Sequence, residues 1–151
     1  MIEPLRLSVD LECSVEHAFD VWTGRIGAWW PKGHSASGDP GTAVHLEPHV
    51  GGRIYERTPE GAEHDWGRII RWEPPSRLGY EWHIGRDADA ATDVDLTFVD
   101  LGDARTRLEI VHSGWEALGD EAVSWRQANT GGWESLLPDF VTAAEDLGVG
   151  S

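Results

Sequence analysis

The sequence lacks the features that would connect it with secretion, disulfide bonding or a membrane. Cys13 is the only cysteine among the 151 residues, which excludes an intrachain disulfide. No apolar run approaches the roughly 18 residues that a membrane span needs. Residues 1–4 contain no basic stretch leading into an apolar one, so no signal peptide is predicted. These absences together predict a cytoplasmic protein.

Positive charge is also scarce. The chain carries 12 Lys and Arg against 27 Asp and Glu, and its formal net charge is −15 with the histidines neutral. Such an acidic body repels phosphate backbones and anionic lipid surfaces. We therefore expect neither a nucleic acid nor a membrane among its partners.

A long C-terminal helix is the element around which the remaining chain is organised. It is predicted over about 120–147 because apolar residues recur at steps of three and four, which places them on one helical stripe. The stripe consists of Trp133, Leu137, Phe140, Ala144 and Leu147.

The ends and the interior of this helix have their own signals. Asp120 suits the N-cap and Gly148 the C-cap. Gly131 and Gly132 lie inside it, where we expect them to face the sheet and leave space. Pro138 predicts a kink, because proline removes one backbone hydrogen bond and crowds the preceding turn.

The residues before this helix predict mainly strands. A half-buried strand at 5–11 precedes a helix that starts at Val15, capped by Ser14, and ends near 24–27. A further turn at 28–30 stops at Pro31, and 32–41 is predicted as a loop. Six more strands follow, separated by turns rich in Gly, Pro or Asp, and are centred on 44–46, 53–58, 63–72, 78–84, 94–98 and 108–112. The order predicts one α+β domain over 1–151, with helices on one face of an antiparallel sheet.

A series of short motifs occurs in a fixed order along nearly the whole chain. They are Ala28-Trp29-Trp30-Pro31, Glu47-Pro48 followed by Gly51-Gly52-Arg53, Trp66-Gly67, Trp72-Glu73-Pro74-Pro75 with Arg77-Leu78 and Trp82, His112-Ser113-Gly114, and Gly132-Trp133. In this order the chain resembles the START-like (SRPBCC) superfamily. More narrowly, it resembles bacterial proteins similar to the C-terminal domain of the activator of heat-shock protein 90 ATPase. The resemblance implies a helix-grip fold, in which a curved antiparallel sheet of six to seven strands wraps around the C-terminal helix over a cavity.

Residues typical of metal or covalent chemistry do not form a complete set. His45 and His49 are four apart, but a strand followed by Pro48 does not place them on one face as a helix would. The glycines at 51 and 52 lead into a strand, whereas phosphate-binding glycines open a helix. No nucleophile elbow is present, and Cys13 lies at a predicted strand–helix junction. We predict no metal, no cofactor and no covalent nucleophile.

Strand alternation predicts polar side chains on the inner face of the sheet. If Ile54 points inward, so does Glu56, and if Ile110 points inward, so does His112. Each is interpreted either as a hydrogen-bonded core residue or as a polar anchor or acid–base pair in a cavity. On the strand at 63–72 the same parity fails, and its inner face stays unassigned.

The nine tryptophans exceed what one small core normally needs. Trp22, Trp82 and Trp133 fit the predicted core stripes. Trp29 and Trp30 are adjacent, and a short turn does not easily bury both. At least one of them is therefore expected at a cavity mouth or a partner surface.

These expectations combine into a function. We predict non-enzymatic binding of a small hydrophobic or aromatic molecule in a cavity between the sheet and the C-terminal helix, with no catalytic residue. The predicted ligand-binding residues are Trp30, Ile54, Glu56, Tyr80, Trp82, Phe98, Ile110, His112, Trp125, Asn129 and Trp133. Two further functions stay open: a co-chaperone-like partner that stimulates a chaperone ATPase, and a cyclase- or aromatase-like enzyme that uses the same cavity.

The charge balance generates a direct prediction. At physiological salt, micromolar protein is expected to leave the electrophoretic mobility of DNA and RNA unchanged, because the acidic surface repels the phosphates. A mobility shift that weakens as salt rises would contradict this expectation.

Overall fold

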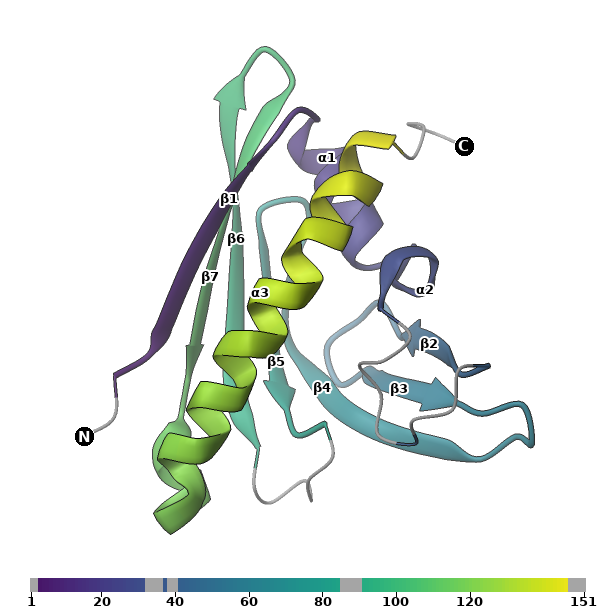
Figure 1. The fold of residues 1–151 in the computed structure, drawn as a ribbon. Helices are drawn as coiled ribbons and strands as arrows, with labels where there is room; N and C mark the ends of the chain where they lie inside the picture. Colours follow the sequence, from purple (N-terminus) through teal and green to yellow (C-terminus); the bar gives the residue numbers. More distant parts are fainter. Residues whose placement is uncertain (1–2, 32–36, 38–40, 85–90, 147–151) are drawn as a thin grey trace.

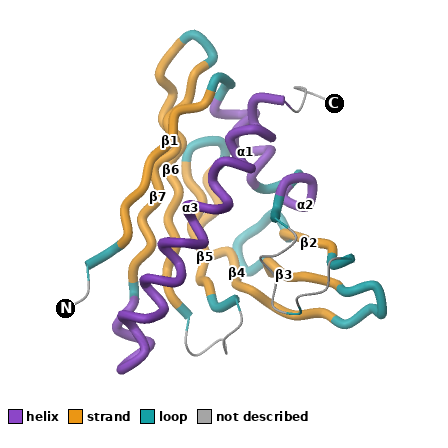
Figure 2. The backbone as a smooth tube through the Cα atoms, in the orientation of Figure 1, coloured by secondary structure: helices purple, strands orange, loops and turns teal. Residues whose placement is uncertain are grey.

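In the computed structural model, seven strands form one antiparallel sheet that curls around a long helix (Figures 1 and 2). The structure describes residues 3–31, 37, 41–84 and 91–146. Most of the predicted loop at 32–41 and of the acidic turn at 85–92 lies outside the described residues, as do Leu147 and Gly148 of the predicted C-cap.

The elements follow the predicted order. They are β1 (Leu5–Leu11), α1 (Val15–Trp22), α2 (Ile26–Trp29), β2 (Ala43–Leu46), β3 (Arg53–Arg57), β4 (Glu63–Glu73), β5 (Arg77–Trp82), β6 (Thr92–Gly102), β7 (Arg105–Ser113), the 3₁₀ helix η2 (Trp115–Glu121) and α3 (Ala122–Asp146). The strand order in the sheet is β1-β7-β6-β5-β4-β3-β2. In Figure 1, α3 runs across the inner side of the curled sheet, with α1 and α2 beside its C-terminal half. The predicted helix-grip arrangement is confirmed.

The C-terminal helix differs from the prediction at its start. Residues 115–121 form a 3₁₀ helix that precedes α3, and Gly119, with a positive φ of 57°, introduces a kink inside it. Asp120 therefore lies before α3 and does not cap it. The helix continues through Pro138 without interruption, and this proline is exposed. Gly131 is also exposed, with open space around its Cα, so the expectation that it faces the sheet is wrong.

The apolar stripe of α3 packs against a tryptophan from α1. Trp22 is fully buried, with ring centroids 4.8 Å from Phe140 and 6.1 Å from Trp133. The N-terminus of α1 is capped by Ser14, whose hydroxyl accepts a hydrogen bond from the backbone N–H of His17. Burial raises the pKa of the Tyr80 hydroxyl, and its side chain forms a hydrogen bond with Trp22. These contacts join α1 and α3 to the sheet.

The irregular parity of β4 has a structural cause. The register with β3 shifts beside Trp66, and the register with β5 shifts beside Ile70. Each extra residue moves the inner face by one position. Trp66 and Ile69 are both fully buried although they are three apart, while Ile70 is 48% exposed.

Cys13 sits at the junction between β1 and α1 and is buried. Burial is the main cause that raises the pKa of its thiol to about 11, and the carboxylates of Glu145 and Glu12 add to it. Since the thiolate is the reactive form, this cysteine is poorly suited to nucleophilic chemistry near neutral pH. None of the described helices is long and apolar enough to cross a lipid bilayer.

The packing of Phe140 generates a stability prediction. Phe140→Ala is expected to lower the free energy of unfolding by about 3–5 kcal/mol, because it leaves a cavity beside Trp22. Urea denaturation followed by circular dichroism measures the change. Val123→Ala is the matched control, since Val123 lies on the same helix and is 59% exposed. Equal losses in the two variants would contradict the central role of Phe140.

Candidate ligand-binding site

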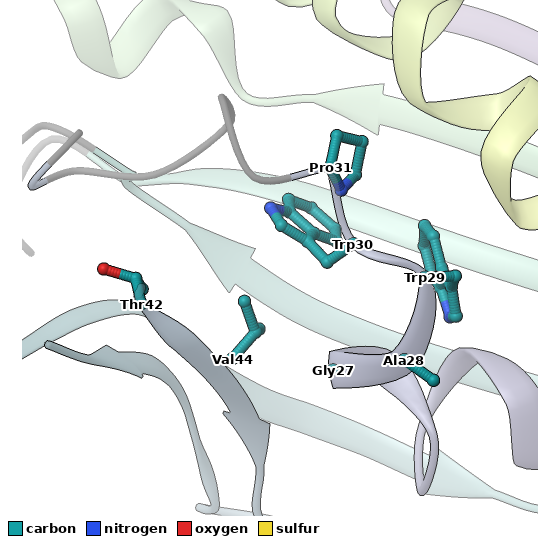
Figure 3. Close-up of a pocket in the computed structure, with 7 residues that line it drawn as sticks. All are labelled: Gly27, Ala28, Trp29, Trp30, Pro31, Thr42 and Val44. Carbon is teal, nitrogen blue, oxygen red and sulfur yellow. The ribbon is translucent and has the colours of Figure 1, made fainter. Parts of the chain in front are cut away.

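A pocket of about 200 Å³ lies between α2 and β2 (Figure 3). Its lining residues are Gly27, Ala28, Trp29, Trp30, Pro31, Thr42 and Val44. In Figure 3 the Val44 side chain points from β2 toward the ring of Trp30, and Pro31 lies beyond that ring. The pocket thus has an aromatic wall on the helix side and an aliphatic wall on the strand side.

Trp29 and Trp30, at the end of α2, point in different directions. Trp29 turns toward the helices, where its indole N–H donates to the carbonyl of Val21 (2.8 Å) and its ring lies 5.1 Å from Phe140. Trp30 has an extended backbone (φ −58°, ψ 127°), and its ring turns toward the sheet. Both are buried, 6% and 8% exposed, so the expectation that a short turn cannot bury both is wrong. Both nevertheless line the pocket.

A glycine allows α2 to approach β2 this closely. A Cβ placed on Gly27 would lie 2.8 Å from the carbonyl oxygen of Val44, closer than real Cβ atoms come. Any larger residue at position 27 would push the helix away from the strand. Gly27 therefore helps set the width of the pocket.

Behind the pocket lies a fully buried carboxylate. Glu56 on β3 is the cross-strand partner of Val44, so the two side chains share one face of the sheet. Its Oε1 accepts a hydrogen bond from the indole N–H of Trp66 (2.7 Å). Its Oε2 accepts from the hydroxyl (2.6 Å) and backbone N–H (3.2 Å) of Ser37, and from the Thr42 hydroxyl at 3.4 Å. Because Thr42 lines the pocket, it connects the pocket with this carboxylate.

An aromatic cluster continues from the pocket wall into the core. The ring centroid of Trp30 lies 5.2 Å from that of Trp66 and 5.8 Å from that of Trp82. Trp82 in turn lies 5.6 Å from Tyr80. Since Trp66 also holds Glu56, the same side chain connects the aromatic cluster with the carboxylate.

The other inward polar residue, His112 on β7, is engaged by side chains of α3 and β6. Its Nδ1 lies 3.0 Å from the indole nitrogen of Trp133, and its Nε2 lies 2.6 Å from the hydroxyl of Thr92. An indole nitrogen can only donate, so Nδ1 accepts and the proton of the neutral ring is on Nε2. That N–H donates to Thr92, whose hydroxyl donates to the carbonyl of Trp82 (3.2 Å). His112 is therefore held as one neutral tautomer.

The family model for Activator of Hsp90 ATPase homolog 1-like protein matches residues 12–145. The chain belongs to this family. The match confirms the predicted resemblance, including membership of the START-like superfamily.

Several solved structures resemble this family member. The anthrahydroquino-γ-pyrone synthase Txn09, solved with a compound designated SUM, is 39% identical, covers 82% of this chain and 84% of its own, and has a TM-score of 0.61. The self-sacrificing resistance protein CalC from Micromonospora echinospora is 25% identical, with coverages of 99% and 98% and a TM-score of 0.73. Protein NE0264 from Nitrosomonas europaea, at 16% identity, coverages of 96% and 93% and a TM-score of 0.65, shows the shared fold. A comparison with curated protein sequences finds no match.

The predicted site residues lie on several strands and on α3, and the structure does not bring all of them together. Glu56 and His112 point inward as predicted, but β6, β5 and β4 separate their strands and their hydrogen-bond partners differ. Trp125 and Asn129 are half-buried on α3, where the Asn129 amide donates to the carbonyl of Trp125 (2.8 Å). The remaining predicted residues are buried, and they are Trp30, Ile54, Tyr80, Trp82, Phe98, Ile110 and Trp133. Trp30 lines the pocket shown in Figure 3, and a ligand-binding role for the whole set stays a prediction.

Four residues that line the pocket or bind Glu56 were not predicted as site residues: Thr42, Val44, Ser37 and Trp66. The motif Trp66-Gly67 was visible in sequence, but the register shift hid the direction of Trp66. The role of Val44 follows only from its pairing with Glu56, which strand alternation alone does not give.

The two histidines considered for metal binding, His45 and His49, have different surroundings. His45 packs on the ring of Tyr55, with centroids 5.2 Å apart, and His49 is exposed with its Nδ1 3.0 Å from the carbonyl of Val50. Within the part of the chain that the structure describes, no three His, Cys, Asp or Glu side chains gather as metal ligands would.

A second, more open hollow of about 500 Å³ lies beside α1. It is lined by Glu16, Phe19, Asp20, Thr23, Gly24, Pro48, Trp72, Pro74 and Pro75.

The His112 network generates a prediction. His112→Phe leaves the buried Trp133 N–H without its acceptor, which is expected to lower the free energy of unfolding by about 1–3 kcal/mol. Urea denaturation measures the loss, and His64→Phe on exposed β4 surface is the control. In the unchanged protein, ¹⁵N NMR is expected to find His112 as the Nε2–H tautomer. An Nδ1–H tautomer would contradict the network.

Proposed function

We propose that this protein binds a flat aromatic small molecule in the pocket between α2 and β2. The observation that carries the proposal is the pairing of Val44, which lines the pocket, with Glu56, a fully buried carboxylate. Ligand sites combine apolar walls with a few polar groups that fix orientation. Trp30 and Val44 supply the apolar contact, and Thr42, whose hydroxyl lies 3.4 Å from Oε2 of Glu56, connects the pocket with the polar group.

The size and walls of the pocket limit the ligand. Drug-sized ligands occupy pockets of roughly 300–1,000 Å³, so a pocket of about 200 Å³ suits a core of roughly two fused aromatic rings. A flat ring bound here would contact the ring of Trp30 and the methyl groups of Val44, which both line the pocket (Figure 3). Offset contact between aromatic rings contributes about 0.5–1.5 kcal/mol beyond the burial of apolar area.

One solved relative supports an aromatic ligand. Txn09, at 39% identity, is a synthase of an anthrahydroquinone-fused γ-pyrone, which is a polycyclic aromatic compound. This relative also favours a second candidate function, in which the present chain closes a ring on a bound aromatic substrate. The family description suggests a third, stimulation of a chaperone ATPase, for which the described site offers no separate feature.

The binding proposal is tested with naphthalene derivatives. Titration of 2-methoxynaphthalene is expected to quench tryptophan emission and to raise the melting temperature, because the ligand stacks on Trp30. At 100 times its dissociation constant it should stabilise the fold by about 2.7 kcal/mol. Val44→Phe is expected to fill the pocket and abolish binding.

Val50→Phe is the matched control, since Val50 is 64% exposed and lies outside the pocket. If Val44→Phe binds as tightly as the control variant, the ligand occupies another site. If neither naphthalenes nor larger arenes shift the melting temperature of the unchanged protein, the binding proposal is wrong, and stimulation of a chaperone ATPase should be measured in its place.

The enzymatic candidate has its own test. Closing a γ-pyrone from a phenol with an adjacent 1,3-dicarbonyl chain forms one C–O bond and releases one water. A carboxylate such as Glu56 can accept the phenolic proton during this step. Incubation with such a phenol, followed by mass spectrometry, is expected to give a product lighter by one water. Unchanged substrate at high protein concentration would exclude the ring-closing function for that compound class.

A further inference from the structure

The two oxygens of the Glu56 carboxylate are held by different parts of the protein. Oε1 accepts from Trp66, a fully buried residue on the central strand β4. Oε2 accepts from Ser37 and Thr42, which both lie in the chain between α2 and β2. One oxygen is therefore fixed by the sheet, and the other is covered by residues next to the pocket.

Two of the donors to Oε2 are hydroxyl groups, which a ligand hydroxyl can replace, and the third is the backbone N–H of Ser37 (3.2 Å). The short bond, 2.6 Å, comes from the hydroxyl of Ser37, which is an exposed residue. Exchanging one hydroxyl donor for another at the same acceptor preserves the hydrogen bond and leaves no buried group unsatisfied. Thr42 lines the pocket, and its hydroxyl makes only a long contact, 3.4 Å, with Oε2.

We propose that the ligand is an aromatic alcohol whose hydroxyl takes the place of the Ser37 hydroxyl and donates to Oε2 of Glu56. This inference rests on the proposed binding function and names its ligand class. Trp66 is then a positioning residue, because its N–H occupies Oε1 and leaves Oε2 as the oxygen that meets Thr42, a residue of the pocket wall. Ser37 competes with the ligand for the same oxygen.

The proposal distinguishes hydroxyarenes from arenes that cannot donate. A carboxylate oxygen only accepts, so an ether oxygen in the same place finds no donor and faces the negative charge. Hydrogen bonds to charged groups are stronger than those between neutral groups. We expect 2-naphthol to bind about tenfold or more tightly than 2-methoxynaphthalene.

The closing experiment compares these compounds by calorimetry on the full chain and on variants. Glu56→Gln is expected to lose the preference for 2-naphthol. In this variant the Trp66 N–H needs an acceptor, so the amide oxygen of the new side chain takes the position of Oε1. The NH₂ group then takes the position of Oε2. There it donates to a hydroxyl oxygen and to an ether oxygen alike. Ser37→Ala is expected to bind 2-naphthol several-fold more tightly than the unchanged protein, with little change for 2-methoxynaphthalene, because it removes the competing donor.

The outcomes separate this inference from the function on which it rests. Equal binding of both compounds by the unchanged protein leaves the aromatic pocket intact and overturns the role of Glu56. If neither these compounds nor larger arenes bind, the proposed function and the inference are both wrong. If Glu56→Gln does not fold, as judged by circular dichroism, Ser37→Ala decides: an unchanged or weakened affinity for 2-naphthol overturns the proposal.

Discussion

The contact between Trp22 and the apolar stripe of α3 is the interaction on which the rest of the structure depends. A curled sheet exposes a concave apolar face, and burying that face against a helix removes it from water. Trp22 lies between the helices and meets Trp29, Trp133 and Phe140. Through Trp29 the same packing fixes the end of α2, and with it the wall of the pocket.

Much of the fold follows from short-range patterns. Alternation predicted the positions of the strands. It also predicted the inward direction of four side chains that the structure shows buried: Ile54, Glu56, Ile110 and His112. The cap at Ser14 and the stripe of α3 were also predictable, because each depends on neighbours within a few residues. Such patterns determine which residues are buried. They carry no information on which strand lies beside which, beyond the preference for adjacent hairpins.

The parts that sequence reasoning missed depend on long-range or irregular geometry. Register shifts beside Trp66 and Ile70 break the alternation of β4, and only its partner strands reveal them. Gly119 kinks the 3₁₀ segment through a positive φ that helical periodicity does not indicate. Burial of Trp29 and Trp30 together required the extended backbone at Trp30. The pocket itself arises where α2 meets β2, so its lining could not be listed from periodicity.

The two inward polar groups, which looked equivalent in sequence, have different surroundings. His112 is enclosed by Trp133, Trp115 and Thr92, and its hydrogen bonds join β7, α3 and β6. Glu56 lies beside the pocket and receives part of its hydrogen bonding from residues that line or approach it. Burial alone therefore does not separate a structural group from a candidate ligand contact, whereas the origin of the donors does.

The aromatic cluster also has an optical consequence. Successive indole centroids lie 5.2 Å apart between Trp30 and Trp66, 5.6 Å between Trp29 and Trp30, and 5.1 Å between Trp22 and Trp29. At such separations an excited indole passes its energy to its neighbours before it emits. The tryptophan fluorescence of the protein is therefore expected to report on this series of rings together and not on any one indole.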